Sequence, residues 1–213
     1  MSANVPPPEN QSLKEAWESH LHQSYEKGAA VYDAKRWKPA WGQFLKSEED
    51  ALLRELLPLG PGSRILDVAA GTGRASLAIA PLGADITGVD ISANMLAQAE
   101  ASRKAAGFDN VRFQEGRADA LDFPDASFDA VMSIRFLHLI PRDIQPEYIS
   151  EMIRVLKPGG SLVLEWANRW DGFGYGIVKN FLKHHLKGTR NRGTILPRQV
   201  RTLLPGLRIV EER

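Results

Sequence analysis

This chain of 213 residues lacks several features, and each absence excludes a class of protein. It has no cysteine, which excludes disulfides, thiolate metal sites and cysteine nucleophiles. Its formal net charge is only +1, so the composition as a whole gives no sign of polyanion binding. No apolar run reaches the length of a membrane-spanning helix, and the polar start of the chain, with Pro6, Pro7 and Pro8, is unlike a signal peptide. We therefore expect a soluble, cytoplasmic protein.

The length predicts a single domain with a sizeable core. Composition and pattern divide it into a disordered lead (1–10), a helical cap (11–60), a core (61–167) and a basic C-terminal segment (168–213).

Two helices are predicted in the cap. A capping box, Ser12-x-x-Glu15, opens the first helix, and apolar residues then recur at every fourth position. A second helix follows Ser47 and ends at Pro58. Helices placed before a sheet are expected either to contribute aromatic core or to cover the ligand-binding edge. In the second case three residues are expected to reach the ligand: Tyr25, Tyr32 and Arg36.

The stretch that organises the chain runs from Ile65 to Arg74. An apolar run leads into Asp67-x-Ala69-x-Gly71-x-Gly73, and a helical pattern follows. Strand, tight turn and helix in this order form the first unit of a doubly wound sheet. Small residues let a ligand approach the backbone closely, and amides at the helix start face it. The dinucleotide pattern G-x-G-x-x-G fails, because Ser76 stands at the third glycine position.

Strands and helices alternate through the rest of the core. This alternation predicts an α/β fold with a doubly wound, Rossmann-like, mostly parallel sheet, helices on both faces and a ligand at the carboxyl edge of the strands. After the strand at 64–68, further strands are predicted at 84–90, 111–114, 128–134, 161–166 and 206–210, with a helix ending near 106, another at 146–156 and a turn at 157–160.

Asp90 ends the second predicted strand, 17 residues after Gly73. An acid at about this distance from the glycine turn binds the ribose hydroxyls in nucleotide folds. The alternative is that Asp90 caps the helix that follows. In the first case Ile91 and Met95 are placed to pack on the base.

Together these motifs resemble the class I S-adenosylmethionine (SAM)-dependent methyltransferases of the small-molecule type, similar to the quinone-biosynthesis methyltransferases. The resemblance covers about residues 60–167 and implies SAM as cofactor, S-adenosylhomocysteine as product and Asp90 as the ribose ligand. It implies that the turn holds the methionine part and that the loop after the third strand holds adenine. The motifs that carry it are the turn with Asp67, Ala69, Ala70, Gly71, Thr72 and Gly73, then Val89-Asp90, Gly116 to Pro124, Phe128-Asp129 and Arg154 to Gly160.

Two positions depart from the family pattern. Ala69 stands where the family usually has glycine, which costs little if its φ is negative. The adenine loop reads Gly116-Arg117-Ala118 in place of Gly-Asp-Ala, and arginine cannot accept a hydrogen bond. The Ala118 amide remains able to donate to the ring. Either Asp119 replaces the missing acceptor or Arg117 stacks on adenine.

The end of the fourth strand is the expected reaction edge. In the family, backbone carbonyls at Ser133 and Ile134 meet the methionine end. His138 is the candidate general base, since an imidazole titrates near neutral pH, and the alternative is a structural histidine. Arg135 pairs either with an anionic substrate or with a surface acid. No metal-ligand constellation is evident, so no metal is predicted.

The C-terminal segment, 168–213, holds ten Lys and Arg residues against three acids. We interpret it either as a lid with a cationic inner face, favouring an anionic or membrane-associated acceptor, or as a solvated basic helix. The family normally adds a seventh, antiparallel strand, which is missing here. The chain is then a fragment, or its sixth strand pairs atypically, for example across a homodimer.

The sequence therefore predicts a SAM-dependent methyltransferase that moves a methyl group to oxygen, nitrogen or carbon of a small-molecule acceptor. RNA or protein methylation is an alternative suggested by the basic segment, although nucleic acid is disfavoured, because the fourth strand lacks the Asn/Asp-Pro-Pro-aromatic motif of base methyltransferases. A SAM-binding protein without catalysis is the alternative from another class.

Overall fold

The computed structural model describes residues 9–37, 40–57 and 60–165, and its centre is a parallel sheet of five strands in the order β3-β2-β1-β4-β5. All strand pairs are parallel, as expected for strands that are buried on both faces. The predicted α/β, Rossmann-like architecture is thereby confirmed. The strands are β1 (Arg64–Val68), β2 (Asp85–Asp90), β3 (Val111–Glu115), β4 (Phe128–Ser133) and β5 (Leu156–Leu164).

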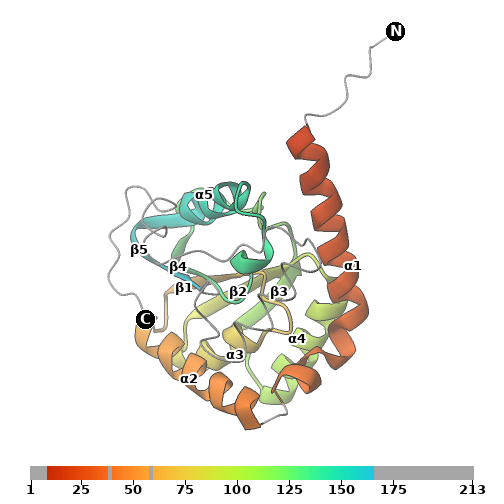
Figure 1. Cartoon of the computed structure of the whole chain (residues 1–213). Helices are drawn as coiled ribbons and strands as arrows, with labels where there is room; N and C mark the ends of the chain where they lie inside the picture. The colour runs from red at the N-terminus through yellow and green to blue at the C-terminus, as the bar shows by residue number, and fades with distance from the viewer. Residues whose placement is uncertain (1–8, 38–39, 58–59, 166–213) are drawn as a thin grey trace.

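Helices cover both faces of the sheet (Figure 1). On one face lie α2 (Ala40–Leu56), α3 (Arg74–Ile79) with the short η1 (Ala80–Leu82), and α4 (Ala93–Ala106). On the other face lies α5 (Gln145–Val155), which follows the single turn η2 (Leu137–Leu139). Strand order reverses at β1, since β2 lies on one side of it and β4 on the other, and ligands of such sheets bind at this switch point.

The alternating side chains of the strands divide the core into two clusters. In β1, Leu66 and Val68 pack toward α5 with Ile149 and Met152, whereas Ile65 packs toward α2 and α3. Asp67 has the same parity as Ile65, so its carboxylate is directed to the α3 side of the sheet. The sheet thus places one acidic side chain beneath the glycine turn within an otherwise apolar layer.

The N-terminal helices are longer than predicted. Helix α1 (Glu9–Trp37) begins three residues before the predicted capping box, and α2 begins at Ala40 rather than at Ser47. Residues 9 and 10, predicted in the disordered lead, are helical. The last of the three prolines is Pro8, and proline is tolerated just before a helix, so the helix can begin at the next residue. Figure 1 shows α1 extending along one end of the sheet, as the predicted cap required.

The segment from Arg154 to Gly160 explains a motif found in the sequence. The Arg154 guanidinium donates to the carbonyls of Leu121 and Phe123 and so holds the loop that leads to β4. The register of β4 and β5 shifts between Leu156 and Ser161, so the predicted turn at 157–160 is an irregularity inside β5. A Cβ at Gly160 would lie 2.8 Å from the Asp129 carbonyl oxygen, so that position favours glycine.

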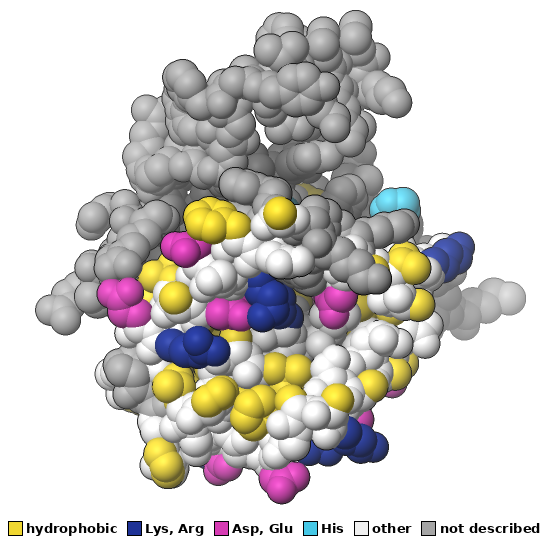
Figure 2. Space-filling view, turned by 90° about the horizontal axis from the view of Figure 1, so that it is seen from below, with side chains coloured by type: hydrophobic (Ala, Val, Ile, Leu, Met, Phe, Trp, Pro, Cys, Tyr) yellow, Lys and Arg dark blue, Asp and Glu magenta, His cyan; other side chains and the backbone are white. Residues whose placement is uncertain are grey.

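On the face shown in Figure 2, acidic and basic side chains are interspersed with hydrophobic ones among the described residues. That part of the surface therefore does not form a patch of one charge sign, which polyanion binding favours. No helix of the described residues is long and apolar enough to cross a membrane. The predicted lid and sixth strand, in 168–213, lie outside the described residues.

Candidate cofactor and acceptor site

The turn between β1 and α3 contains three residues whose backbone lies in the left-handed region. The φ angles are 61° at Ala69, 55° at Gly71 and 75° at Gly73. The condition under which Ala69 would cost little, a negative φ, is therefore not met. An alanine in this region costs about 1–2 kcal/mol, because its Cβ crowds the following carbonyl. The Ala70 amide donates to the Val89 carbonyl (3.0 Å) and fixes the turn to β2.

Gly73 has a packing role in this structure. A Cβ there would lie 2.5 Å from Cζ of Phe113 and 2.9 Å from the Cβ of Ala99. Gly73 thus lets α3 approach β3 and α4, and it is not among the residues that line the cavity described below. Gly71 does line the cavity, and a Cβ there would meet no atom within 4 Å. A ligand therefore has room to approach the backbone at Gly71.

Asp67 is buried beneath the turn. Its side chain accepts a hydrogen bond from the Ser76 hydroxyl at 2.7 Å, and the residue is 1% exposed. Burial raises the pKa of Asp67 to about 7, although the bond from Ser76 and the charge of Arg74 oppose the shift. A carboxyl group poised near neutral pH inside a cavity wall is a candidate for binding a cation.

Asp90 ends β2 and has its carboxylate held by two backbone amides. Gly71 donates to one oxygen (2.8 Å) and Ser92 to the other (2.9 Å). Each oxygen keeps a lone pair, so the carboxylate can accept two more hydrogen bonds. Burial raises the pKa of Asp90, and the amides oppose that shift. The helix-cap alternative is not the main role, since the Ser92 side chain caps α4 by accepting from Met95.

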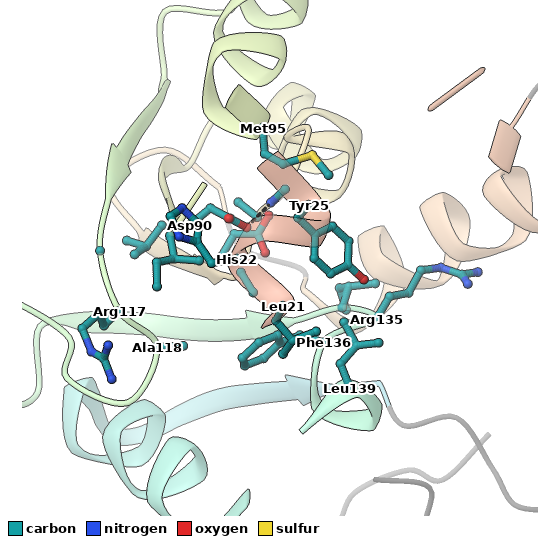
Figure 3. Close-up of a pocket in the computed structure, with 18 of the residues that line it drawn as sticks. Leu21, His22, Tyr25, Asp90, Met95, Arg117, Ala118, Arg135, Phe136 and Leu139 are labelled. Carbon is teal, nitrogen blue, oxygen red and sulfur yellow. Dashed lines mark hydrogen bonds between the residues drawn. The ribbon is translucent and has the colours of Figure 1, made fainter. Parts of the chain in front are cut away.

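A cavity of about 1130 Å³, including the part open to solvent, joins these groups at the carboxyl edge of the sheet. Figure 3 shows Asp90 and Met95 on one side of it, Arg117 and Ala118 at one end, and Arg135 and Leu139 at the other. Of the predicted site residues, the cavity is lined by Asp67, Ala69, Ala70, Gly71, Thr72, Asp90, Ile91, Met95, Ala118 and Asp119.

The loop after β3 is tied to α1 by charged groups. Arg117 donates to Asp119 and to Glu18 of α1, each at 2.8 Å, and Lys14 of α1 lies 2.8 Å from the same Asp119 oxygen. Burial opposes ionisation of Asp119, but the bonds from Arg117 and Lys14 outweigh it and lower its pKa. Arg117 is therefore directed to carboxylates in this structure.

Two predicted residues near the end of β4 are not among those that line the cavity. The Ser133 hydroxyl donates to the Val68 carbonyl, and the Ser133 carbonyl accepts from the amide of Glu165. His138 lies in η2, the single turn that follows β4. Their neighbours Ile134 and Arg135 line the cavity instead. Arg135 has a φ of 61° and forms an ion pair with Glu49 of α2.

Helix α1 forms a cavity wall that the sequence predicted only in part. Tyr25 and Tyr32 line the cavity as predicted, and so do Glu18, Leu21 and His22. The side chain of Arg36 lies outside the described residues. The spacing 18, 21, 22, 25 describes one face of a helix, which was the available signal. Near the other end of α1, the Thr72 hydroxyl donates to Asp33 at 2.9 Å and holds the helix against the turn.

Comparison with known proteins identifies the family to which this chain belongs. Residues 65–160 match the family described as a methyltransferase domain. A demethylmenaquinone methyltransferase from Geobacillus kaustophilus is 35% identical over 167 residues, which cover 76% of this chain and 69% of that protein. The chain belongs to the class I SAM-dependent methyltransferases. The predicted family, its fold and SAM as its cofactor are thereby confirmed.

Solved structures of similar chains agree with this membership. The YcgJ protein from Bacillus subtilis superposes with a TM-score of 0.58 at 27% identity, covering 74% of this methyltransferase and 66% of that chain. The [4+2]-cyclase SpnF superposes with a TM-score of 0.61 at 28% identity, covering 68% of this chain and 58% of the cyclase. Several other curated relatives are matched over only 39% to 51% of their length. Among the described residues of this methyltransferase, no group of three or more acidic or histidine side chains is arranged to hold a metal.

Proposed function

We propose that this methyltransferase binds SAM along the carboxyl edge of the sheet and methylates oxygen, nitrogen or carbon of a small molecule held under α1. The observation that carries the proposal is the Asp90 carboxylate, which two backbone amides fix at the cavity wall and which keeps two accepting positions. A ribose diol offers two hydroxyl donors at the spacing of a single carboxylate.

The described residues fit the rest of the cofactor. Asp67 supplies negative charge on the side of the glycine turn, where the ammonium of the methionine end belongs. The space at Gly71 admits a ligand against the backbone, and Ile91 and Met95 offer apolar surface to a base. Bound SAM supplies a methyl group on a positively charged sulfur, which suits in-line displacement.

The chain contributes alignment of the reactants and exclusion of water. Leu21 and Tyr25 of α1 lie across the cavity from the strand ends and shield them (Figure 3). His138 is not among the residues that line the cavity. Its role as a general base remains a prediction.

The acceptor is assigned to the half of the cavity away from Arg117 and Ala118. Tyr25 lines it from α1, with the ring centroid of Tyr32 6.0 Å from its own, and Leu139 lines it from the segment after β4. In Figure 3 the Tyr25 hydroxyl points toward the start of the Arg135 side chain, whose guanidinium extends away from Tyr25 and pairs with Glu49 of α2. Aromatic and aliphatic walls of this kind favour a flat, largely apolar acceptor.

The charges of this half also favour an uncharged acceptor. The Arg74 guanidinium is bound by Glu49 (2.6 Å) and Asp50 (2.7 Å), and Arg135 is paired with Glu49. An anionic acceptor would have to compete with these carboxylates of α2. The predicted anionic or membrane-associated acceptor rested on residues 168–213, outside the described residues, and it remains a prediction, as does a homodimer.

A second candidate is cofactor binding without methyl transfer. It is favoured by the similarity to SpnF, which is 28% identical and is named for a [4+2]-cyclisation and not for methyl transfer. The two candidates share the cofactor site and differ in whether a methyl group leaves it.

Calorimetric titration with SAM, S-adenosylhomocysteine and NAD tests the cofactor site first. We expect binding of the first two, no binding of NAD, and at least about 10-fold weaker binding by Asp90→Asn, because one charged acceptor is replaced. Asp85→Asn, at the exposed opposite end of β2, is the matched control and should bind as wild type does. Failure of folded wild type to bind SAM would overturn the proposal. Methyl transfer to screened apolar acceptors then separates the two candidates.

A further inference from the structure

Helix α1 presents one face with polar groups to the end of the cavity that holds Arg117 and Ala118. Lys14 and Glu18 stand on this face one turn apart, and Leu21 follows. Glu18 is the α1 carboxylate that lines the cavity, and its side chain is 14% exposed. This face therefore brings an acid from the cap to the base-binding end of the proposed cofactor site.

That end of the cavity suits a purine ring. Ile91 and Met95 follow directly on Asp90, while Ala118 and Leu21 close the space from the β3 loop and from α1 (Figure 3). With the ribose on Asp90, the base extends away from the glycine turn into this apolar compartment. Adenine carries a 6-amino group, and a donor in such a compartment needs an acceptor to avoid the cost of desolvation.

The acceptor that the loop itself offers is Asp119, which is the rival to Glu18 and is less exposed than Glu18. Arg117, at the position where the family pattern has an acid, has only donors. Asp119 is present, but one of its oxygens is shared by Lys14 and Arg117 at 2.8 Å each, and its side chain is 9% exposed. Two cations thus hold Asp119 in a structural ion pair between the loop and α1.

We propose that Glu18 of α1 accepts the hydrogen bond from the 6-amino group of the cofactor's adenine. Its two oxygens are held by the Tyr148 hydroxyl (2.5 Å) and by Arg117 (2.8 Å), and each retains a lone pair. Tyr148 is buried, and burial together with the bond to Glu18 raises its pKa, so it stays a donor. The carboxylate is therefore fixed by two donors beside Ala118. The inference rests on the proposed cofactor site.

Binding discrimination tests this proposal better than activity. The probes are S-adenosylhomocysteine and its analogue in which hydrogen replaces the 6-amino group, and the readout is the ratio of their dissociation constants. Wild type should prefer the amino form by about 10- to 100-fold, the range expected for a hydrogen bond to a charged group. Glu18→Met, which keeps the side-chain length, should bring the ratio close to one.

Two further variants separate the rivals. Glu15→Met changes an exposed acid on the same helix and should keep the wild-type ratio. Asp119→Asn should also keep it. If Asp119→Asn abolishes the preference and Glu18→Met does not, Asp119 accepts the hydrogen bond from the 6-amino group and the proposal is overturned. An unchanged ratio in Glu18→Met overturns it as well. If wild type binds neither probe, the cofactor site fails, and Glu18 fails with it.

Discussion

Asp67 combines two properties that oppose each other, since it is fully buried and it faces the cofactor cavity. In the protein without cofactor, ionising this carboxyl group costs folding free energy, because the unfolded chain solvates it better. The raised pKa gives the sign. Well below the unfolded-state pKa of 3.8 the group is protonated in both states and has no effect on stability through its charge. As pH rises toward 7, the unfolded state loses its proton first, so stability falls.

The magnitude follows from the shift of the pKa. A rise from 3.8 to about 7 corresponds to about 4 kcal/mol of lost stability once the group is ionised in both states. Between pH 5 and pH 8 the change amounts to about 2–3 kcal/mol. Asp67→Asn removes this pH-dependent part. It also places an amide against Ser76, and the free-energy cost of this change does not depend on pH. The informative quantity is therefore the change, between pH 5 and pH 8, in the difference in unfolding free energy between variant and wild type.

Urea unfolding of wild type and Asp67→Asn at pH 5 and pH 8 measures this quantity. We expect the variant to gain about 2–3 kcal/mol relative to wild type on going from pH 5 to pH 8. Asp85→Asn, at the exposed end of the neighbouring strand, should show no comparable gain. The variant should also bind S-adenosylhomocysteine more weakly, because the charge that faces the ammonium is lost. A parallel pH dependence in wild type and Asp67→Asn would refute the reasoning.

Three further substitutions test the geometry by urea unfolding. Ala69→Gly should stabilise the protein by about 0.5–1 kcal/mol, because glycine relieves the left-handed φ but loses more entropy on folding; no gain would mean that the turn does not hold this φ. Gly88→Ala should destabilise it by about 1–3 kcal/mol, because the new Cβ would lie 2.5 Å from Phe113, and tolerance of alanine would contradict this packing. Arg154→Lys should cost about 1–2 kcal/mol, since the lysine ammonium lacks the planar fork by which Arg154 reaches the carbonyls of both Leu121 and Phe123; a neutral substitution would contradict this role.

The strands were predictable because their signals are local. The predicted strand from Arg64 to Val68 and the predicted helix end at Gly107 have the same boundaries in the structure. Both signals, apolar periodicity and a left-handed glycine, depend on near neighbours in the sequence. The positive φ of Ala69 was not predictable, because alanine rarely adopts it and the surrounding turn imposes it. Which residues after β4 line the cavity was also not predictable: Leu139 and Ile140 do and His138 does not, because closeness in sequence to β4 does not reveal how η2 is turned.

The cavity wall formed by α1 shows a second limit. The sequence indicated a helix and an apolar stripe, but the face of α1 that lines the cavity is fixed in part by ion pairs between residues about 100 positions apart, such as Glu18 and Arg117. Such pairs have no local signal. The same holds for Glu49, which lies in α2 and reaches both Arg74 and Arg135.

The cavity draws its floor and its roof from separate parts of the chain. The floor belongs to the stretch that matches the methyltransferase family, residues 65–160, whereas the roof is a helix that precedes this stretch. Substitutions on the inner face of α1 can therefore alter which molecules are admitted, and how long they stay, without disturbing the register of any strand. In this arrangement the acceptor can change through substitutions on α1 while the strand ends and the glycine turn stay the same.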